Sequence, residues 1–165
     1  MPRSASSAAV ADAGPLIALA RLDRLALLEG LFGQVLVPEA VFAECMARPE
    51  LADATRIRQG CESGGLTICV ATPVAAADLG RGERSAIGKA IELKAALLAD
   101  DLAARRRAEA LGLVTIGTLG VLIRAKRKGL LPQVRPEVDR LRASGYWLGD
   151  DLLRAALRAA GESDL

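Results

Sequence analysis

Short apolar runs alternate with longer segments of helical periodicity along this chain. The runs at 8–12 and 95–99 each lead into a carboxylate, whereas leucine recurs every third residue from 16 to 28, the spacing of one helix face. Gly14 and Pro15 separate the first run from that helix, and proline suits a first helical turn. The predicted strands are 8–12, 34–37, 66–70, 95–99 and 113–116, and the predicted helices are 16–33, 38–48, 51–61, 82–94, 102–111, 118–128, 133–143 and 150–160.

The alternation of short strands with helices predicts an α/β fold, a three-layer α/β/α sandwich around a mostly parallel central sheet. The length of 165 residues suits a single domain over 1–165, with 1–7 as a loose N-terminal tail. The composition is 52% hydrophobic but only 2% aromatic, so the core has to be built from Leu, Val, Ile and Ala. With so few aromatic side chains, a base-stacking platform for single-stranded nucleic acid is not expected.

Missing residue types exclude several kinds of active site. The chain has no histidine, which removes Ser–His–Asp and Cys–His catalysis as well as His-ligated zinc. Its cysteines, at 45, 61 and 69, lack CxxC spacing, so neither a disulfide framework nor a zinc cluster is predicted. Reduced, buried thiols are expected instead. Catalysis would have to use carboxylates, hydroxyls, lysine or metal-bound water.

The N-terminal region 1–20 is rich in small apolar residues and contains Arg3, as signal peptides do. Asp12 and Pro15 interrupt this region, and no apolar run approaches the ~20 residues of a membrane span. We therefore expect a cytoplasmic protein without a membrane segment.

Two predicted strands end in carboxylates, Asp12 after the first and Asp100 and Asp101 after the fourth. Because ligands bind in the crevice at the carboxyl ends of parallel strands, these side chains predict an acidic site for a divalent cation. Helix capping is the alternative, since a helix follows each strand and aspartate caps well. A cap uses only one carboxylate, and adjacent like charges repel unless a cation lies nearby, so the Asp100–Asp101 pair favours a ligand role. For Asp12 both interpretations stay open.

Two glutamates add to the candidate site, each with a plain structural alternative. Glu44 stands in an otherwise apolar stretch, where a buried carboxylate is costly unless it is paired or metal-bound. It suits the solvated side of its helix equally well. Glu83 lies in the first turn of the helix predicted over 82–94, where an acid also interacts favourably with the helix dipole.

The order and spacing of these acids resemble the PIN-domain family. The resemblance runs over 9–162 and narrows to a little-characterised bacterial and archaeal subfamily related to the toxin ribonucleases of toxin–antitoxin pairs. It rests on five motifs in order, at 12–17 (DAGPLI), 37–44 (VPEAVFAE), 82–87 (GERSAI), 97–105 (LLADDLAAR) and 111–126 (LGL, GTLGVL and AK).

That resemblance implies a metal-dependent ribonuclease, the toxin half of a toxin–antitoxin pair. By motif position, the family's acidic metal site corresponds to Asp12, Glu44, Glu83 and one or both of Asp100 and Asp101. Thr118 matches a hydroxyl position beside that site. Clustered oxygen ligands suit Mg²⁺ or Mn²⁺, and such ions can activate water and stabilise a leaving oxygen. The implied partners are single-stranded RNA, an antitoxin protein and a second copy of the chain, for which the apolar segment 16–32 is either a dimer face or core.

Positive charge is concentrated in one stretch of the chain. The net charge is only +2, yet between 105 and 128 seven basic residues accompany a single acid, Glu109. They either contact RNA phosphates or form a solvated helix face. Arg105 could form a salt bridge to Asp101 instead of contacting RNA. Arg81 and Arg84 could likewise form salt bridges to Glu83. The seven are Arg105, Arg106, Arg107, Arg124, Lys126, Arg127 and Lys128.

Two other classes of function compete with the ribonuclease. One is a non-catalytic PIN scaffold that binds a partner protein or RNA. The other is a receiver-like or phosphatase-like doubly wound domain. Against the latter, the first strand leads into Asp-Ala-Gly rather than an acidic pair, and no lysine follows the strand at 113–116.

Overall fold

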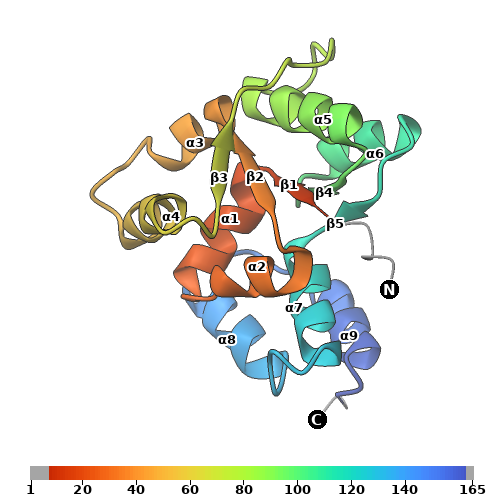
Figure 1. Ribbon diagram of the computed structural model, residues 1–165. Coiled ribbons are helices and arrows are strands. Elements are labelled where there is room, and N and C mark those ends of the chain that lie inside the picture. Colours follow the sequence, from red (N-terminus) through yellow and green to blue (C-terminus); the bar gives the residue numbers. More distant parts are fainter. Residues whose placement is uncertain (1–7, 163–165) are drawn as a thin grey trace, which may run out of the picture.

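The computed structural model describes residues 8–162 and contains one five-stranded sheet (Figure 1). The spatial order of the strands is β3-β2-β1-β4-β5, and each neighbouring pair is parallel. This confirms the α/β class and shows that the sheet is parallel throughout. The strands are β1 (Ala9–Ala11), β2 (Val35–Pro38), β3 (Thr67–Cys69), β4 (Ala96–Leu98) and β5 (Thr115–Ile116).

Helices connect the strands and follow the last one. The early helices are α1 (Ala13–Arg21), α2 (Ala26–Phe32), α3 (Glu39–Cys45) and α4 (Ala52–Glu62). The later ones are α5 (Arg81–Leu93), α6 (Leu102–Ala110), α7 (Thr118–Arg127), α8 (Arg135–Ala143) and α9 (Asp150–Ala159).

The helices form two layers around the sheet. Helix α5 packs on β1, β2 and β4 and contacts α3 and α6, while α1 contacts α4 and α7. In Figure 1, α5 and α6 lie on one side of the strands and α1, α2, α7, α8 and α9 on the other. All three residues of β1 are fully buried at the centre of this sandwich. Leucine, valine, isoleucine and alanine supply nearly all of the core, as the composition predicts.

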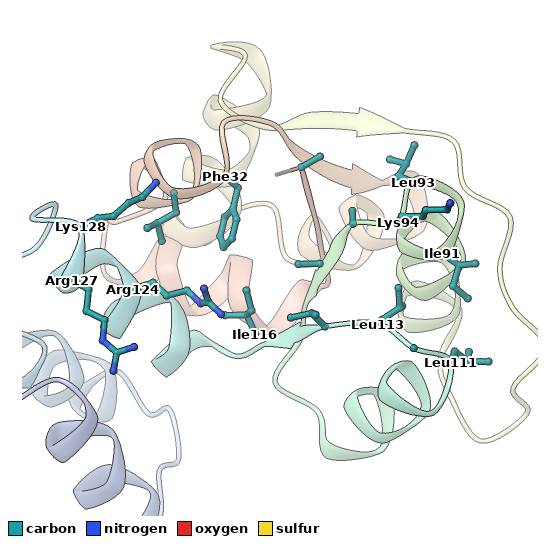
Figure 2. Close-up of a pocket in the computed structure, with 16 residues that line it drawn as sticks. Phe32, Ile91, Leu93, Lys94, Leu111, Leu113, Ile116, Arg124, Arg127 and Lys128 are labelled. Carbon is teal, nitrogen blue, oxygen red and sulfur yellow. The ribbon is translucent and has the colours of Figure 1, made fainter. Parts of the chain in front are cut away.

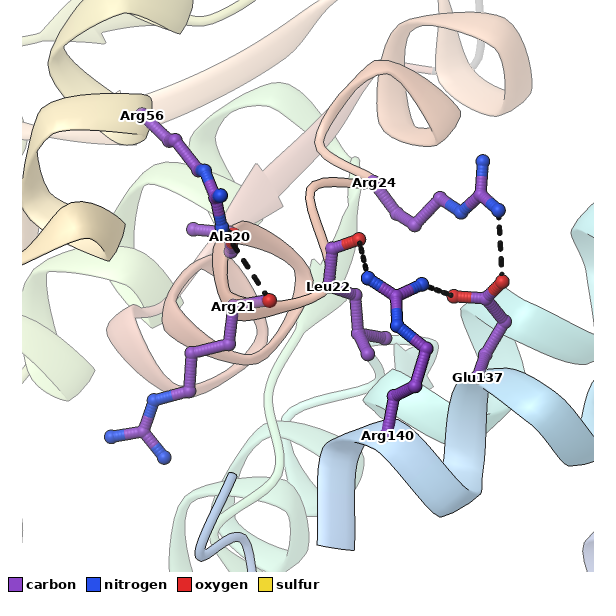
Figure 3. Close-up of polar contacts among 7 residues, drawn as sticks. All are labelled: Ala20, Arg21, Leu22, Arg24, Arg56, Glu137 and Arg140. Carbon is purple, nitrogen blue, oxygen red and sulfur yellow. Dashed lines mark hydrogen bonds and ion pairs between the residues drawn. The ribbon is translucent and has the colours of Figure 1, made fainter. Parts of the chain in front are cut away.

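The helix predicted over 16–33 is in fact two helices, so this prediction was wrong in its continuity. The chain leaves α1 at Arg21, and Asp23 adopts a positive φ of 55° before α2 begins. Two arginines from distant segments donate to carbonyls at this break (Figure 3): Arg56 Nη1 donates to the Ala20 carbonyl at 2.7 Å, and Arg140 Nη2 to that of Leu22 at 3.0 Å. Cationic donors at a helix C-terminus are favourable.

A buried glutamate on α8 orders the arginines at this break. Glu137 is only 4% exposed, and its two carboxylate oxygens accept from Arg24 at 2.9 Å and from Arg140 at 3.1 Å. Figure 3 shows the carboxylate between the two guanidinium groups. Glu137 therefore connects α8 to the junction of α1 and α2.

The cysteines are only partly as predicted from the sequence. The three cysteines are free, but only Cys45 is buried, and Cys61 and Cys69 are partly exposed. The burial of Cys45 raises the pKa of its thiol to about 12. No helix within residues 8–162 is both long enough and apolar enough to cross a membrane. The predicted tail at 1–7 lies outside the described residues.

Replacing Glu137 with glutamine should lower the free energy of unfolding by about 1–3 kcal/mol, because two charge-assisted hydrogen bonds are weakened at a buried position. Urea denaturation followed by circular dichroism measures this change. Asp139→Asn, at an exposed position of the same helix, is the matched control and should stay within about 0.5 kcal/mol of the wild type. Equal stability of both variants would contradict the role given to Glu137.

Candidate metal centre at the carboxyl ends of the strands

The candidate acids meet where the strand order of the sheet reverses. From β1 the chain builds outward through β2 to β3, then returns to place β4 on the other side of β1. The pairing of β1 with β4 continues beyond the strands, since the Asp12 amide donates to the Leu98 carbonyl at 2.9 Å. Such a reversal leaves a crevice at the carboxyl ends of the strands. Asp12 and the Asp100–Asp101 pair both stand at this edge.

Asp12 is buried without using its side chain as a helix cap. It occupies the N-cap position of α1, but its carboxylate accepts no capping hydrogen bond, so the capping interpretation was wrong. The residue is 6% exposed, and its Oδ1 has no hydrogen-bond partner. Burial raises the pKa of Asp12 from 3.8 to about 7; the adjacent amide of Ala13 opposes this, and the charges of Glu83, Glu44 and Asp101 add to it.

Glu83 and Glu44 approach Asp12 from two helices that pack together, α5 and α3. Glu83 Oε2 accepts from the Gly80 amide at 3.2 Å, which caps the start of α5. Its pKa is raised, chiefly by burial and then by Asp101 and Glu44. Glu44 is exposed, yet its carboxylate lies directly over Gly82, where an added Cβ would stand 2.8 Å from Glu44 Cδ. Glu44 is therefore exposed to solvent and also part of the acidic site.

The structure separates the roles of Asp100 and Asp101. Asp101 caps α6, because its Oδ2 accepts from the Ala104 amide at 2.9 Å, and its charge also acts on Asp12 and Glu83. Asp100 instead faces the start of α7. Its Oδ1 accepts from the Thr118 amide at 2.7 Å, and its Oδ2 from Thr118 Oγ1 at 2.6 Å.

Tyr146 is a member of this site that sequence reasoning missed. Its hydroxyl donates to Asp100 Oδ2 at 2.7 Å, and burial together with Asp100 raises its pKa, so the phenol stays a proton donor. A signal was present in the sequence. The only tyrosine stands beside the only tryptophan, Trp147, in a chain with 2% aromatic residues, and Gly145 and Gly149 flank them.

The site thus has two parts. One is an acidic cluster whose members interact through their charges: Asp12, Glu44, Glu83 and Asp101. The other is a hydrogen-bonded network beside it, formed by Asp100, Thr118 and Tyr146. The two parts adjoin at the start of α1, where Gly14 faces Asp100: an added Cβ at Gly14 would lie 3.5 Å from Asp100 Oδ2. Within residues 8–162, no group of three or more acids is close enough to hold a metal ion by itself.

A hydrated divalent ion fits this donor set better than a fully protein-ligated one. Mg²⁺ keeps several waters and is usually bound through one or two carboxylates plus substrate phosphates. The Asp12 Oδ1, buried and without a partner, is the orphaned acceptor that such an ion would satisfy. Glu83, Glu44 and Asp101 would hold its waters.

The basic stretch does not form one surface. Lys126 Nζ donates to Glu162 Oε2 at 3.0 Å, and Arg127 Nη2 to the Ala159 carbonyl at 3.0 Å, so both hold the chain around the end of α9. Arg107 pairs with Asp78 at 3.5 Å. The remaining four of the seven form no ion pair within the described residues; these are Arg105, Arg106, Arg124 and Lys128.

Arg105 lies beside Asp100 and not Asp101, which corrects the predicted salt bridge. An added Cβ at Gly117 would stand 2.8 Å from Arg105 Nη1 and 3.0 Å from Asp100 Oδ1, so both groups lie over this glycine. Across residues 8–162, neither Arg81 nor Arg84 pairs with Glu83. These arginines therefore do not neutralise the acidic cluster.

A cavity of about 900 Å³ lies at the opposite edge of the sheet, around the residues that precede β1, β4 and β5 (Figure 2). Its walls include Phe32, Ile91 and Leu113, and Arg127 and Lys128 stand at one end. None of the candidate acids lines it. The end of the basic stretch is thus separated from the acidic cluster by the length of the strands.

Comparison with protein families agrees with this architecture. A family model described as a PIN domain matches residues 8–162. Among solved structures, the chain is similar to a PilT N-terminus domain protein from the hyperthermophilic archaeon Sulfolobus solfataricus, with 20% sequence identity and a TM-score of 0.44 over 69% of this chain and 89% of that one. The comparison with curated proteins found no match.

The raised pKa of Asp12 predicts how the metal-free protein responds to pH. Because the folded state holds this proton more tightly than the unfolded state, stability should fall as pH rises from about 4 to 7. Asp12→Asn removes the titration, so at pH 8 in chelator the variant should be more stable than the wild type, by up to about 4 kcal/mol. Denaturant unfolding at pH 4 and pH 8 measures the difference, which should vanish at the lower pH. A variant less stable at pH 8 would show that the carboxylate stabilises the fold.

Proposed function

This chain belongs to the PIN-domain family, and from that premise we propose that it is a metal-dependent endoribonuclease acting on single-stranded RNA. PIN domains are generally metal-dependent nucleases. The observation that carries the proposal is the Asp12 carboxylate, buried and partly unpartnered at the strand reversal, with three further acids acting on its charge. In its ionised form, a carboxylate in this position opposes folding unless a cation binds it.

The proposed metal is Mg²⁺ or Mn²⁺, with Asp12 as its direct ligand and Glu83, Glu44 and Asp101 around it. When bound, such an ion supplies an activated water and stabilises the leaving oxygen of a phosphodiester. At the cleavage position, the ion would also offset the repulsion between the acidic cluster and the phosphates of RNA. The Asp100 network supports the site from the side of β5: Thr118 and Tyr146 fix the carboxylate, which in turn positions the start of α7.

The biological role within this proposal is that of a toxin controlled by an antitoxin protein. It rests on the motif resemblance, which also motivates a homodimer. Most of the candidate dimer face at 16–32 is buried in the core: Leu16, Leu19 and Leu28 are fully buried. A dimer would therefore use other surfaces.

A non-catalytic PIN scaffold that binds RNA or protein is the second candidate. One observation favours it: within residues 8–162, no three acids are close enough together to form a ligand set. The two candidates differ in whether purified protein cleaves RNA when metal is supplied.

Cleavage of a labelled single-stranded RNA should require Mg²⁺ or Mn²⁺ and stop in chelator. Asp12→Asn should slow cleavage by at least about 100-fold, because it removes the direct ligand while conserving size. Gel analysis of time courses measures both effects. Asp139→Asn, which changes an exposed acid on α8, serves as the control and should cleave at the wild-type rate. Cleavage by Asp12→Asn at the wild-type rate would rule out the assignment, and no cleavage by any form would leave the scaffold candidate.

Metal should also raise the melting temperature of the wild type, since it binds the assembled carboxylates and not the unfolded chain. The double variant Asp12→Asn, Glu83→Gln should lose this increase. Differential scanning fluorimetry at pH 8, with and without Mn²⁺, makes the comparison. An equal increase in the double variant would indicate that metal binds elsewhere.

A further inference from the structure

The loop between α8 and α9 presents an exposed tryptophan. Trp147 is 85% exposed, more than any other large hydrophobic side chain in the described part of the chain. An indole has a large apolar surface to bury in a contact, and tryptophan is enriched where proteins recognise ligands. Single exposed apolar residues are common, so exposure alone indicates nothing about a ligand. The surroundings of this ring decide its meaning.

The indole lies over a glycine of its own loop. An added Cβ at Gly149 would lie 3.5 Å from Trp147 Cη2 and 3.9 Å from Cζ2, so the six-membered ring faces this glycine. The neighbouring residues anchor the loop on both sides of the ring: Tyr146 is hydrogen-bonded to Asp100, and Leu148 is buried. Trp147 is therefore an exposed ring on an anchored loop.

A cavity of about 520 Å³ joins this ring to the Asp100 network beside the acidic cluster. Asp100 and Thr118 line it together with Trp147 and Leu152, and Arg105 reaches from α6 to Gly117, just before α7. The volume falls in the range of sites for small molecules and cofactors. Any ligand long enough to lie on Trp147 would also come close to Asp100.

The charges of this cavity suit a phosphate-linked ligand. Arg105 and Arg124 line it, and neither forms an ion pair within residues 8–162. The guanidinium group of Arg124 extends toward Ile116 in the cavity at the other end of the strands (Figure 2), which leaves Arg105 as the cation available to bind an anion here. Asp100 is the one acid in its lining, and it is occupied by Thr118 and Tyr146. A flat apolar ring and an arginine without an ion pair in the lining of one cavity are a combination that binds single-stranded nucleic acid.

We propose that this cavity is a nucleobase subsite, in which one base of a single-stranded RNA stacks on Trp147 while Arg105 binds an adjoining phosphate. The inference rests on the proposed function, because it places the subsite on the path of RNA into the acidic cluster. Stacking is tolerant of sequence, so the subsite positions the strand and does not select a particular base. One ring suffices for one base, although the composition speaks against an extended platform.

Trp147 is the only tryptophan, so the intrinsic fluorescence of the protein reports on this ring alone. A single-stranded RNA octamer, added in Mg²⁺ to the Asp12→Asn variant with gels confirming that the RNA stays intact, should quench this emission in a saturable way. The same octamer with an abasic linker in place of each base should not quench it.

Affinity measured by anisotropy of a labelled octamer gives the second readout. In the same Asp12→Asn background, Trp147→Ala should weaken binding by roughly 5- to 150-fold, the range expected for the loss of one stacked base. Trp147→Phe should recover most of the affinity. Val70→Ala, at a 73% exposed apolar position following the other edge strand, is the matched control and should bind as its parent does.

The outcomes separate this inference from the proposed function. If wild-type protein does not cleave RNA but quenching and the loss in Trp147→Ala are observed, the subsite stands and belongs to a binding scaffold. If cleavage occurs but emission and affinity are independent of Trp147, the subsite is wrong and the ribonuclease remains. Absence of RNA binding overturns the subsite as well. The subsite is also wrong if the Trp147 emission changes with protein concentration and not with RNA concentration. Such a change would indicate that a second copy of the chain covers the ring.

Discussion

Parallel pairing of β1 with β4 is the constraint on which the candidate site depends. The register places Ala11 opposite Leu98, so the residues that follow both strands emerge at the same edge of the sheet. The chain leaves β1 toward β2 and returns to β4 from the other side, which opens the crevice between them. Helices α3, α5 and α7 begin or pass at this edge, and each adds one residue to the site: Glu44, Glu83 and Thr118.

In this arrangement, the carboxylate that the site needs for metal binding lowers the stability of the fold. Asp12 stands at the end of the most buried strand, where its ionised form is disfavoured by burial and by three neighbouring acids. Proteins tolerate such a conflict where a site requires it, and the rest of the fold has to compensate. Here an extensive apolar core and the Glu137 interactions around the break after α1 are available to do so. A bound cation would relieve the conflict directly.

Much of the fold and part of the site could be predicted from the sequence. Strand and helix positions follow from local periodicity, because each element has to present an apolar face to the core. The carboxylates of Asp12 and Asp101 could be placed near one another, since the ends of parallel strands share one edge. The break at Asp23 could not, because it depends on Arg56 and Arg140, which reach it from α4 and α8.

By itself, then, the sequence determined a parallel α/β sheet with acids at its strand ends, since both are properties of short segments. Tertiary structure alone decided what each acid does. It left Asp12 uncapped and buried, gave Asp101 to the start of α6, and turned Asp100 toward Thr118 and Tyr146. The physical reason is that a carboxylate's role depends on which donors and charges surround it, and those come from segments distant in the chain.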